Sequence, residues 1–175
     1  MINNDILRRV RYIFDYNDTK MIALFGLADH KVTREQISNW LKKDDDPGFV
    51  ECSDGELAIF LNGLINDRRG KKKGLPAVPE SRLTNNIIFN KLKIALNLRA
   101  DDVLSILTLA GSKISQHELS AFFRKPGHRH YRVCQDQILR NFLQGLQRTY
   151  RPDADAKKPF TWADALEKSA QQSIE

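Results

Sequence analysis

The chain has 175 residues, of which 41% are hydrophobic and 29% are charged, the usual balance of a globular protein. No apolar run approaches the roughly 20 residues that a transmembrane helix needs, and the charged N-terminus lacks the apolar segment of a signal peptide. We therefore expect a cytoplasmic protein with no membrane partner. Two cysteines are too few for a disulfide framework, so free thiols are expected.

The net charge of +6 is unevenly distributed along the chain. Residues 1–69 carry a net charge of −2, residues 70–83 carry +3, residues 84–151 carry +7 and residues 152–175 carry −2. A basic second half can attract nucleic acid or an acidic protein, although a solvated surface can have the same composition.

The first 70 residues predict four helices, because apolar residues recur at helical spacing and no long stretch alternates with period two. Thr33-x-x-Gln36 and Ser53-x-x-Glu56 are predicted to form capping boxes at the third and fourth helices, and Asn3 or Asn4 is predicted to cap the first. The predicted core positions, in chain order, are Ile6, Val10, Ile13, Phe14, Met21, Leu24, Phe25, Ala28, Ile37, Trp40, Leu41, Leu57, Phe60, Leu61 and Leu64.

A Gly-, Pro- and Lys-rich segment follows, and residues 71–83 are predicted to be a linker. Beyond it the sequence repeats itself: shifted by 82 residues, residues 3–70 align without a gap on residues 85–152, with 16 identities in 68 positions. The strongest block is Cys-x-Asp-x-x-Leu-x-x-Phe-Leu-x-Gly-Leu, which begins at Cys52 and again at Cys134. A repeat of this length predicts a duplicated structural unit.

The second unit has matching start signals. Thr84 to Asn86 is predicted to cap its first helix, and Ser115-x-x-Glu118 to form a capping box at its third. The sequence therefore predicts an all-α fold with two homologous four-helix domains, residues 1–70 and 84–151, related by pseudo-two-fold symmetry. Residues 152–175 are predicted to form a tail, with one short helix capped by Thr161.

Two small residues recur inside the repeated block. Gly63 and Gly145 each interrupt a strong helix at a cost of about 1 kcal/mol relative to alanine, which indicates close approach of another helix or backbone exposed to a ligand. Cys52 and Cys134 are either reactive thiols at a helix N-terminus or small buried side chains. Burial is favoured, because no histidine recurs at matching positions in the two units.

Motifs for catalysis are absent from the sequence. It contains no G-x-G-x-x-G, no P-loop, no H-E-x-x-H and no symmetrically placed carboxylate pair, so we expect neither an enzyme nor a cofactor. His128-x-His130-x3-Cys134 resembles a metal site in part. Zinc usually requires four ligands in two close pairs, and arginines lie among these residues, so no metal is expected.

Nucleic acid is the better-motivated partner. Helices two and three of each unit resemble a helix-turn-helix in outline, although any small helical domain offers two packed helices. In the second unit, Gln116, His117, Ser120, Ala121 and Arg124 are expected to face outward, and Tyr131 either stacks on a base or packs against the fold. The predicted contacts to RNA or DNA are Lys71, Lys72, Lys73, Gln116, Arg124, Lys125, Arg129 and Arg132. The alternative is a protein–protein adaptor with an acidic and a basic half.

The duplicated FLNGL and FLQGL blocks, together with NNDILRRVRYIFDYND and WLKKDDDPGFVECSD, resemble the bacterial YehS family over residues 1 to about 151. The first unit fits the family pattern better than the second. In the second unit, Gln135 stands in place of Ser53, and Pro152 stands in place of Gly70. The resemblance implies a helical, cytosolic protein built from two copies of a domain of unknown function. It implies no activity, cofactor or catalytic residue, so the expected function is a non-enzymatic binding or regulatory module.

Overall fold

The computed structural model describes residues 1–153, and the tail helix predicted at Thr161 lies outside the described residues. Within this range the chain forms eight α-helices and no strand, so the all-α prediction is confirmed, and each repeat contains four helices. In chain order they are α1 (Asn3–Ile13), α2 (Asp18–Leu27), α3 (Arg34–Leu41), α4 (Asp54–Arg69), α5 (Asn85–Ala95), α6 (Ala100–Leu109), α7 (Gln116–Phe122) and α8 (Asp136–Tyr150).

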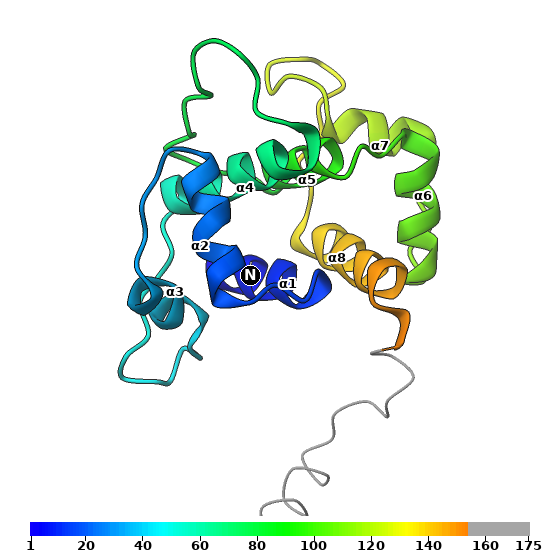
Figure 1. Cartoon of the computed structure of the whole chain (residues 1–175). Helices are drawn as coiled ribbons and strands as arrows, with labels where there is room; N and C mark the ends of the chain where they lie inside the picture. Colours follow the sequence, from blue (N-terminus) through cyan, green and yellow to red (C-terminus); the bar gives the residue numbers. More distant parts are fainter. Residues whose placement is uncertain (154–175) are drawn as a thin grey trace, which may run out of the picture.

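The predicted core positions are buried or half-buried, and the buried apolar residues of both repeats belong to one cluster. In Figure 1, α2 and α3 lie on one side of the molecule and α6 and α7 on the other, with α1, α4, α5 and α8 between them. No helix in residues 1–153 combines the length and the apolar character needed to cross a membrane.

The first helix of each repeat packs against the fourth helix of the other repeat. α5 of the second repeat packs against α4 of the first, and α1 packs against α8 of the second. Two hydrogen bonds join the same elements reciprocally. The backbone N–H of Leu83 donates to Asp54 Oδ2 at 2.9 Å, and the amino group of Met1 donates to Asp136 Oδ2 at 3.0 Å. Met1 and Leu83 are equivalent positions in the 82-residue alignment, as are Asp54 and Asp136.

The recurring glycines lie where helices two and four of each repeat touch. A Cβ atom added at Gly63 would lie 1.8 Å from the carbonyl oxygen of Leu24, and one added at Gly145 would lie 2.1 Å from that of Ile106. Both distances are far inside van der Waals contact, so only glycine permits this approach. The predicted close helix approach is confirmed, and it explains why a poor helix former recurs at this position.

The turn between helices two and three is also common to both repeats. Gly111 has φ +77° and the aligned Asp29 has φ +59°, so both occupy the left-handed region. Glycine adopts this conformation without steric cost, and aspartate tolerates it better than most residues. The sequence difference at this position therefore leaves the turn intact.

Candidate functional site

A buried asparagine holds the segment between helices three and four in each repeat. Asn4 is 0% exposed, and its Nδ2 donates to the carbonyl oxygens of Trp40 and Val50, both at 2.9 Å. Its Oδ1 accepts from the backbone N–H of Cys52 at 2.9 Å. One side chain therefore satisfies three backbone groups that the irregular segment would otherwise leave without a protein partner.

The second repeat reproduces this arrangement. Asn86 Nδ2 donates to the carbonyl oxygens of Phe122 at 2.9 Å and Arg132 at 2.8 Å, and its Oδ1 accepts from the Cys134 N–H at 3.0 Å. The same three bonds at aligned positions indicate that this anchor belongs to the shared scaffold.

The preceding asparagine, Asn3 or Asn85, fixes the start of helix four. Asn3 Nδ2 donates to the Cys52 carbonyl at 3.0 Å and to Asp54 Oδ1 at 2.7 Å. Asn85 makes the same bonds to Cys134 and Asp136. These contacts account for the repeated Asn-Asn and Cys-x-Asp patterns together.

The prediction that Asn3 or Asn4 caps α1 is wrong. Ile2 occupies the N-cap, and its N–H donates to the Asp5 carboxylate at 3.0 Å. Both asparagines instead serve tertiary bonds, which local capping patterns do not reveal. In α5 the cap is Thr84, as predicted, since its hydroxyl accepts from the Ile87 N–H at 3.2 Å.

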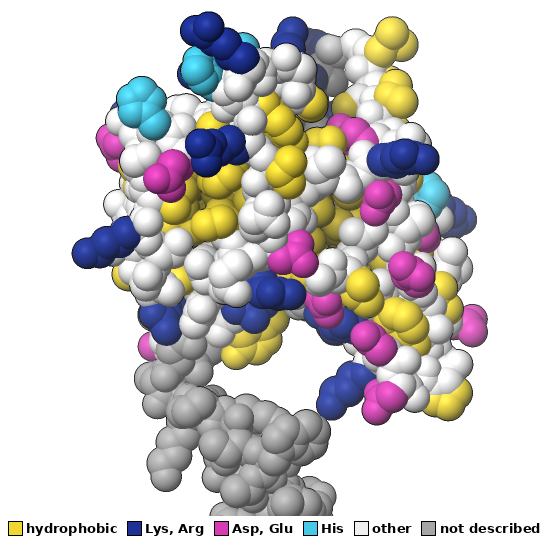
Figure 2. Space-filling view, turned by 180° about the vertical axis from the view of Figure 1, so that it is seen from behind, with side chains coloured by type: hydrophobic (Ala, Val, Ile, Leu, Met, Phe, Trp, Pro, Cys, Tyr) yellow, Lys and Arg dark blue, Asp and Glu magenta, His cyan; other side chains and the backbone are white. Residues whose placement is uncertain are grey.

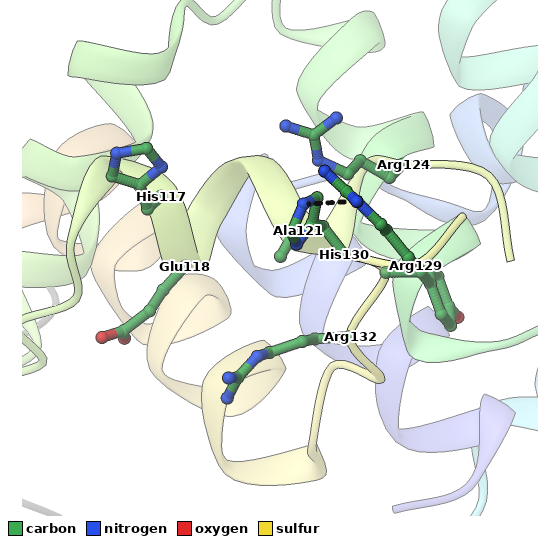
Figure 3. A pocket seen from close by; sticks show the side chains of 8 residues that line it. His117, Glu118, Ala121, Arg124, Arg129, His130 and Arg132 are labelled. Carbon is green, nitrogen blue, oxygen red and sulfur yellow. Dashed lines mark hydrogen bonds between the residues drawn. The ribbon is translucent and has the colours of Figure 1, made fainter.

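A hollow of about 470 Å³ lies between α7 and the segment that leads to α8 (Figure 3). Its lining combines cationic, aromatic and acidic side chains with one small apolar side chain. The lining residues are His117, Glu118, Ala121, Arg124, Arg129, His130, Tyr131 and Arg132.

The hollow brings together three of the predicted nucleic-acid contacts, Arg124, Arg129 and Arg132. None of the three guanidinium groups forms an ion pair with an acidic residue in the described part of the chain. The polar contact of Arg129 is to a histidine, because its Nε donates to His130 Nε2 at 3.0 Å. Unpaired guanidinium groups beside one cavity favour an anionic ligand.

Backbone bonds position the loop side of the hollow. The Arg132 N–H donates to the Ala121 carbonyl at 3.1 Å, while its own carbonyl accepts from Asn86. The segment therefore returns across α7 and covers Ala121, which is 6% exposed. The prediction that Ala121 faces outward is wrong for this reason.

Glu118 has a different role from the one predicted. Its N–H donates to the Ser115 hydroxyl at 3.1 Å, but the return bond of a capping box is not formed. Among residues 1–153, no hydrogen-bond or ion-pair partner is found for the Glu118 carboxylate, which lines the hollow instead. In the first repeat the aligned Gln36 completes the box, accepting from the Thr33 N–H at 2.8 Å.

In the equivalent region of the first repeat, a lysine side chain lies across the loop. Asn39 stands at the position of Ala121 and Lys42 at that of Arg124. Lys42 Nζ donates to Asn39 Oδ1 at 2.9 Å, and it lies only 2.5 Å from where a Cβ atom at Gly48 would be. The lysine side chain therefore crosses the loop, and its charge is engaged with its neighbours.

The other predicted contacts lie apart from this lining. Lys71 Nζ pairs with Asp29 at 2.8 Å. Lys72 and Lys73 are exposed in the connector, and Gln116 and Lys125 are exposed next to the hollow without lining it. Of the eight predicted contacts, the structure thus brings Arg124, Arg129 and Arg132 to one site. The sequence predicts no ligand role for Glu118 or Ala121. The signal that could have revealed both is their difference from the aligned residues of the first repeat, Gln36 and Asn39.

Both cysteines are buried. Burial, with a smaller contribution from Glu56 and Asp54, raises the pKa of the Cys52 thiol to about 12. Burial and the charge of Asp136 likewise raise the pKa of Cys134 to about 12, against a lowering hydrogen bond from the Leu139 backbone. Both thiols are therefore protonated at neutral pH, as structural cysteines are. Within residues 1–153, no three His, Cys, Asp or Glu side chains are grouped as metal ligands.

The charge asymmetry of the sequence is visible on the surface. In Figure 2, seen from behind, Lys, Arg and His side chains gather at the upper left, on the side of α6 and α7. Most acidic side chains lie on the right, on the side of α2 and α3. The hollow is therefore built into the more basic side of the molecule.

Comparison with known proteins agrees with the duplication. The family model described as "Protein of unknown function (DUF1456)" matches twice, over residues 3–70 and 85–151. The uncharacterized protein YehS of Escherichia coli (strain K12) is 47% identical over 147 residues, which cover 83% of this chain and 94% of that protein. No solved structure matches the chain. These matches confirm the resemblance inferred from the repeated blocks, and the chain belongs to the DUF1456 family.

Proposed function

We propose that the protein is a non-enzymatic binding module that holds nucleic acid through the second repeat. The observation that carries this proposal is the grouping of Arg124, Arg129 and Arg132 around one hollow without an acidic partner in the described chain. Guanidinium groups bind phosphate through charge-assisted hydrogen bonds. The net charge of +7 on residues 84–151 adds a field that attracts a polyanion.

The first repeat supports this assignment by contrast, because several of its cations are neutralised internally. Arg8 pairs with Asp5 at 2.6 Å, Arg11 with Asp18 at 3.0 Å and Lys20 with Asp67 at 2.7 Å. Cations engaged in this way are less available to a ligand. The arginines of the hollow retain that capacity.

We infer further that α6 and α7 act as a helix-turn-helix-like pair that presents α7 and its following loop to the ligand. The reciprocal contacts of Asp54 and Asp136 support a pseudo-two-fold relation between the halves. In such an arrangement, α2 and α3 occupy the corresponding place on the acidic side. The two sides would then differ in charge, with only the second suited to phosphate.

Fluorescence anisotropy tests the proposal, with labelled RNA and duplex DNA titrated at several salt concentrations. We expect binding that weakens with salt, because each phosphate contact releases counterions. Replacing Arg124, Arg129 and Arg132 with alanine should lower the slope of log K against log salt by about 2 to 3. Binding that is absent at low salt, or that does not respond to salt, would contradict the proposal.

A matched control removes three charges from the first repeat. Lys31, Arg34 and Arg69 are exposed there, so their triple alanine variant changes the net charge by the same amount. It should retain most of the affinity if the hollow is the binding site. An equal loss in both triple variants would indicate only a general charge effect.

A second candidate, a protein–protein adaptor, is favoured by the connector. Leu75 is 98% exposed and Val78 is 86% exposed, and large apolar side chains held in water are typical of contact surfaces. This alternative predicts a defined complex in a pull-down with the full chain. It also predicts a ratio of absorbance at two wavelengths that shows no co-purified nucleic acid.

A further inference from the structure

We infer that the hollow of the second repeat accommodates one unpaired ribonucleotide of a single-stranded RNA. This inference rests on the proposed function and assigns it a substrate class. It follows from the size of the hollow, from the chemistry of its two edges, and from the residues at which the second repeat differs from the first.

The size of the hollow suits one nucleotide better than a stacked base pair. A hollow of about 470 Å³ falls within the range of sites that enclose one small ligand. A nucleotide inside a duplex is stacked and paired, and it can enter such a site only after leaving the helix. Single-stranded RNA already presents unpaired nucleotides, so it reaches the hollow without that cost.

The two edges of the hollow differ in chemistry. In Figure 3, Arg124 and Arg129 lie on one side of Ala121, near the His130 ring, and Glu118 and Arg132 lie on the other. The phosphate of a nucleotide suits the edge with Arg124 and Arg129. The Glu118 carboxylate repels phosphate and can only accept hydrogen bonds, so this edge suits the ribose hydroxyls.

This placement gives Glu118 a means of distinguishing RNA from DNA. Carboxylates commonly hold ribose hydroxyls in nucleotide sites, and the 2′-hydroxyl is the group that DNA lacks. In the first repeat, the aligned Gln36 is occupied by its bond to the Thr33 N–H. The release of Glu118 from the equivalent bond leaves both of its oxygens for a ligand.

An aromatic side chain completes the lining. Tyr131 is half-buried, and its N–H donates to the His128 carbonyl at 2.9 Å, which holds the loop in a turn. A phenol ring beside a cavity offers a surface on which an unpaired base can stack. The ring therefore accounts for the base, as Arg124 and Arg129 account for the phosphate and Glu118 for the sugar.

Ala121 is the residue that keeps the site open. Its counterpart Asn39 bonds to Lys42 at 2.9 Å and fills the same place in the first repeat. Ala121→Asn should therefore close the hollow with a side chain that the scaffold already accepts. The matched control is Asn39→Ala. It makes the reverse change in the first repeat, which lacks the three arginines of the hollow.

The test compares a labelled single-stranded RNA of about ten nucleotides with single-stranded DNA of the same sequence and with a duplex RNA, by anisotropy at one low salt concentration. We expect the single-stranded RNA to bind most tightly. Ala121→Asn should weaken its binding about tenfold, whereas Asn39→Ala should leave it unchanged. Thermal unfolding of each variant checks that it is folded.

Glu118→Ala provides the second readout. Removing a carboxylate raises the affinity for any polyanion, so the informative quantity is the ratio of RNA to DNA affinity. We expect this ratio to fall about tenfold, the effect of losing one hydrogen bond to a charged group. General charge effects cancel in the ratio, and a purely structural role of Glu118 would not move it.

The outcomes separate this inference from the proposed function. The ribonucleotide site would be overturned if all three nucleic acids bound with equal affinity and Ala121→Asn did not weaken binding. A basic phosphate-binding surface would then remain. Absence of binding to any nucleic acid would overturn both. Selective loss of single-stranded RNA binding in Ala121→Asn, with a reduced ratio in Glu118→Ala, would support the site.

Discussion

The segments between helices three and four of the two repeats make the same backbone hydrogen bonds and differ in their outer side chains. In both, an asparagine of the first helix anchors the loop, and the loop N–H returns to a carbonyl of helix three, from Val50 to Asn39 and from Arg132 to Ala121, at 3.1 Å in each case. One loop contains Asp44, Asp45 and Asp46, and the other Arg129 and His130. The scaffold thus fixes where the loop lies and leaves its outer side chains free to change.

The largest expected effect concerns the helix contact that both repeats share. Gly63→Ala should lower the free energy of unfolding by about 4 kcal/mol, because its Cβ would overlap the Leu24 carbonyl and α2 would have to shift. Gly145→Ala should be nearly as severe, since it overlaps Ile106 in the same way. Urea unfolding followed by circular dichroism measures both.

Gly26→Ala is the control for this comparison, because nothing lies within 4 Å of its added Cβ. It should be neutral or stabilise α2 by up to about 1 kcal/mol. A mild effect of Gly63→Ala or Gly145→Ala would show that the contact is not required in that repeat.

The asparagine anchors sharpen the comparison further. Asn4→Ala and Asn86→Ala should each cost about 2 to 3 kcal/mol in chemical unfolding, because three backbone groups, two of them in buried bonds, lose their partner. Only Asn86→Ala should also weaken RNA binding, since it releases the loop that bears Arg132. Asn90→Ala, without such bonds in residues 1–153, is the control. An equal loss of RNA binding in Asn4→Ala would contradict the division of roles.

A smaller, pH-dependent effect is expected at Asp136. Hydrogen bonds from Asn85 and from the amino group of Met1 lower the pKa of this carboxyl. A lowered folded-state pKa stabilises the protein above the unfolded pKa of about 4, and this contribution is lost as the pH falls through the folded value. Asp136→Asn should therefore reduce stability by less than about 1 kcal/mol at pH 7, because the group is partly exposed.

Thermal unfolding between pH 7 and pH 2 measures this difference, which should shrink as the pH falls. Asp54→Asn is the matched variant, because Asp54 accepts from the neutral Leu83 amide where Asp136 accepts from an ammonium group. A difference that persists unchanged at pH 2 would show that the charge of Asp136 plays no part.

The last expected effect is on reaction rates and concerns the thiols. Because both have a pKa of about 12, Cys52 and Cys134 should react with an aromatic disulfide at pH 8 at least about a hundredfold more slowly than in urea. A folded pKa above the unfolded value of about 8.5 also predicts that stability decreases as the pH rises from there. Fast reaction of only one cysteine would show that the two repeats differ and would indicate a functional thiol in the repeat that reacts.

Much of the scaffold could be predicted from the sequence. Helical periodicity and a gapless duplication are local or repeated signals, so the helices, the core stripes, the Thr33 and Ser53 caps and the close approach at Gly63 and Gly145 were all predictable. Hydrogen bonds between residues far apart in the sequence could not be predicted. An Asn-Asn pair at a helix start is typical of capping, and only the folded chain shows that Asn4 bonds to carbonyls 36 and 46 residues away.

The candidate site could be predicted only in part. Positive charge identified Arg124, Arg129 and Arg132, but the same reasoning included Lys71, which pairs with Asp29. The sequence predicts an outward-facing Ala121, because a short helix gives little periodic signal and the sequence does not reveal the returning loop. The role of Glu118 depends on a capping bond that is not made, and a sequence pattern cannot show that.

The bonds of Leu83 to Asp54 and of Met1 to Asp136 mean that the carboxylate at the start of each fourth helix receives one of its hydrogen bonds from the other half of the chain. A single copy would gain that bond only by meeting a second copy, in an isologous contact where each gives what it receives. Fusion through residues 71–83 turns that encounter between molecules into one within a chain. A homodimer carries identical loops on both sides, whereas a chain with two repeats can carry a different loop on each.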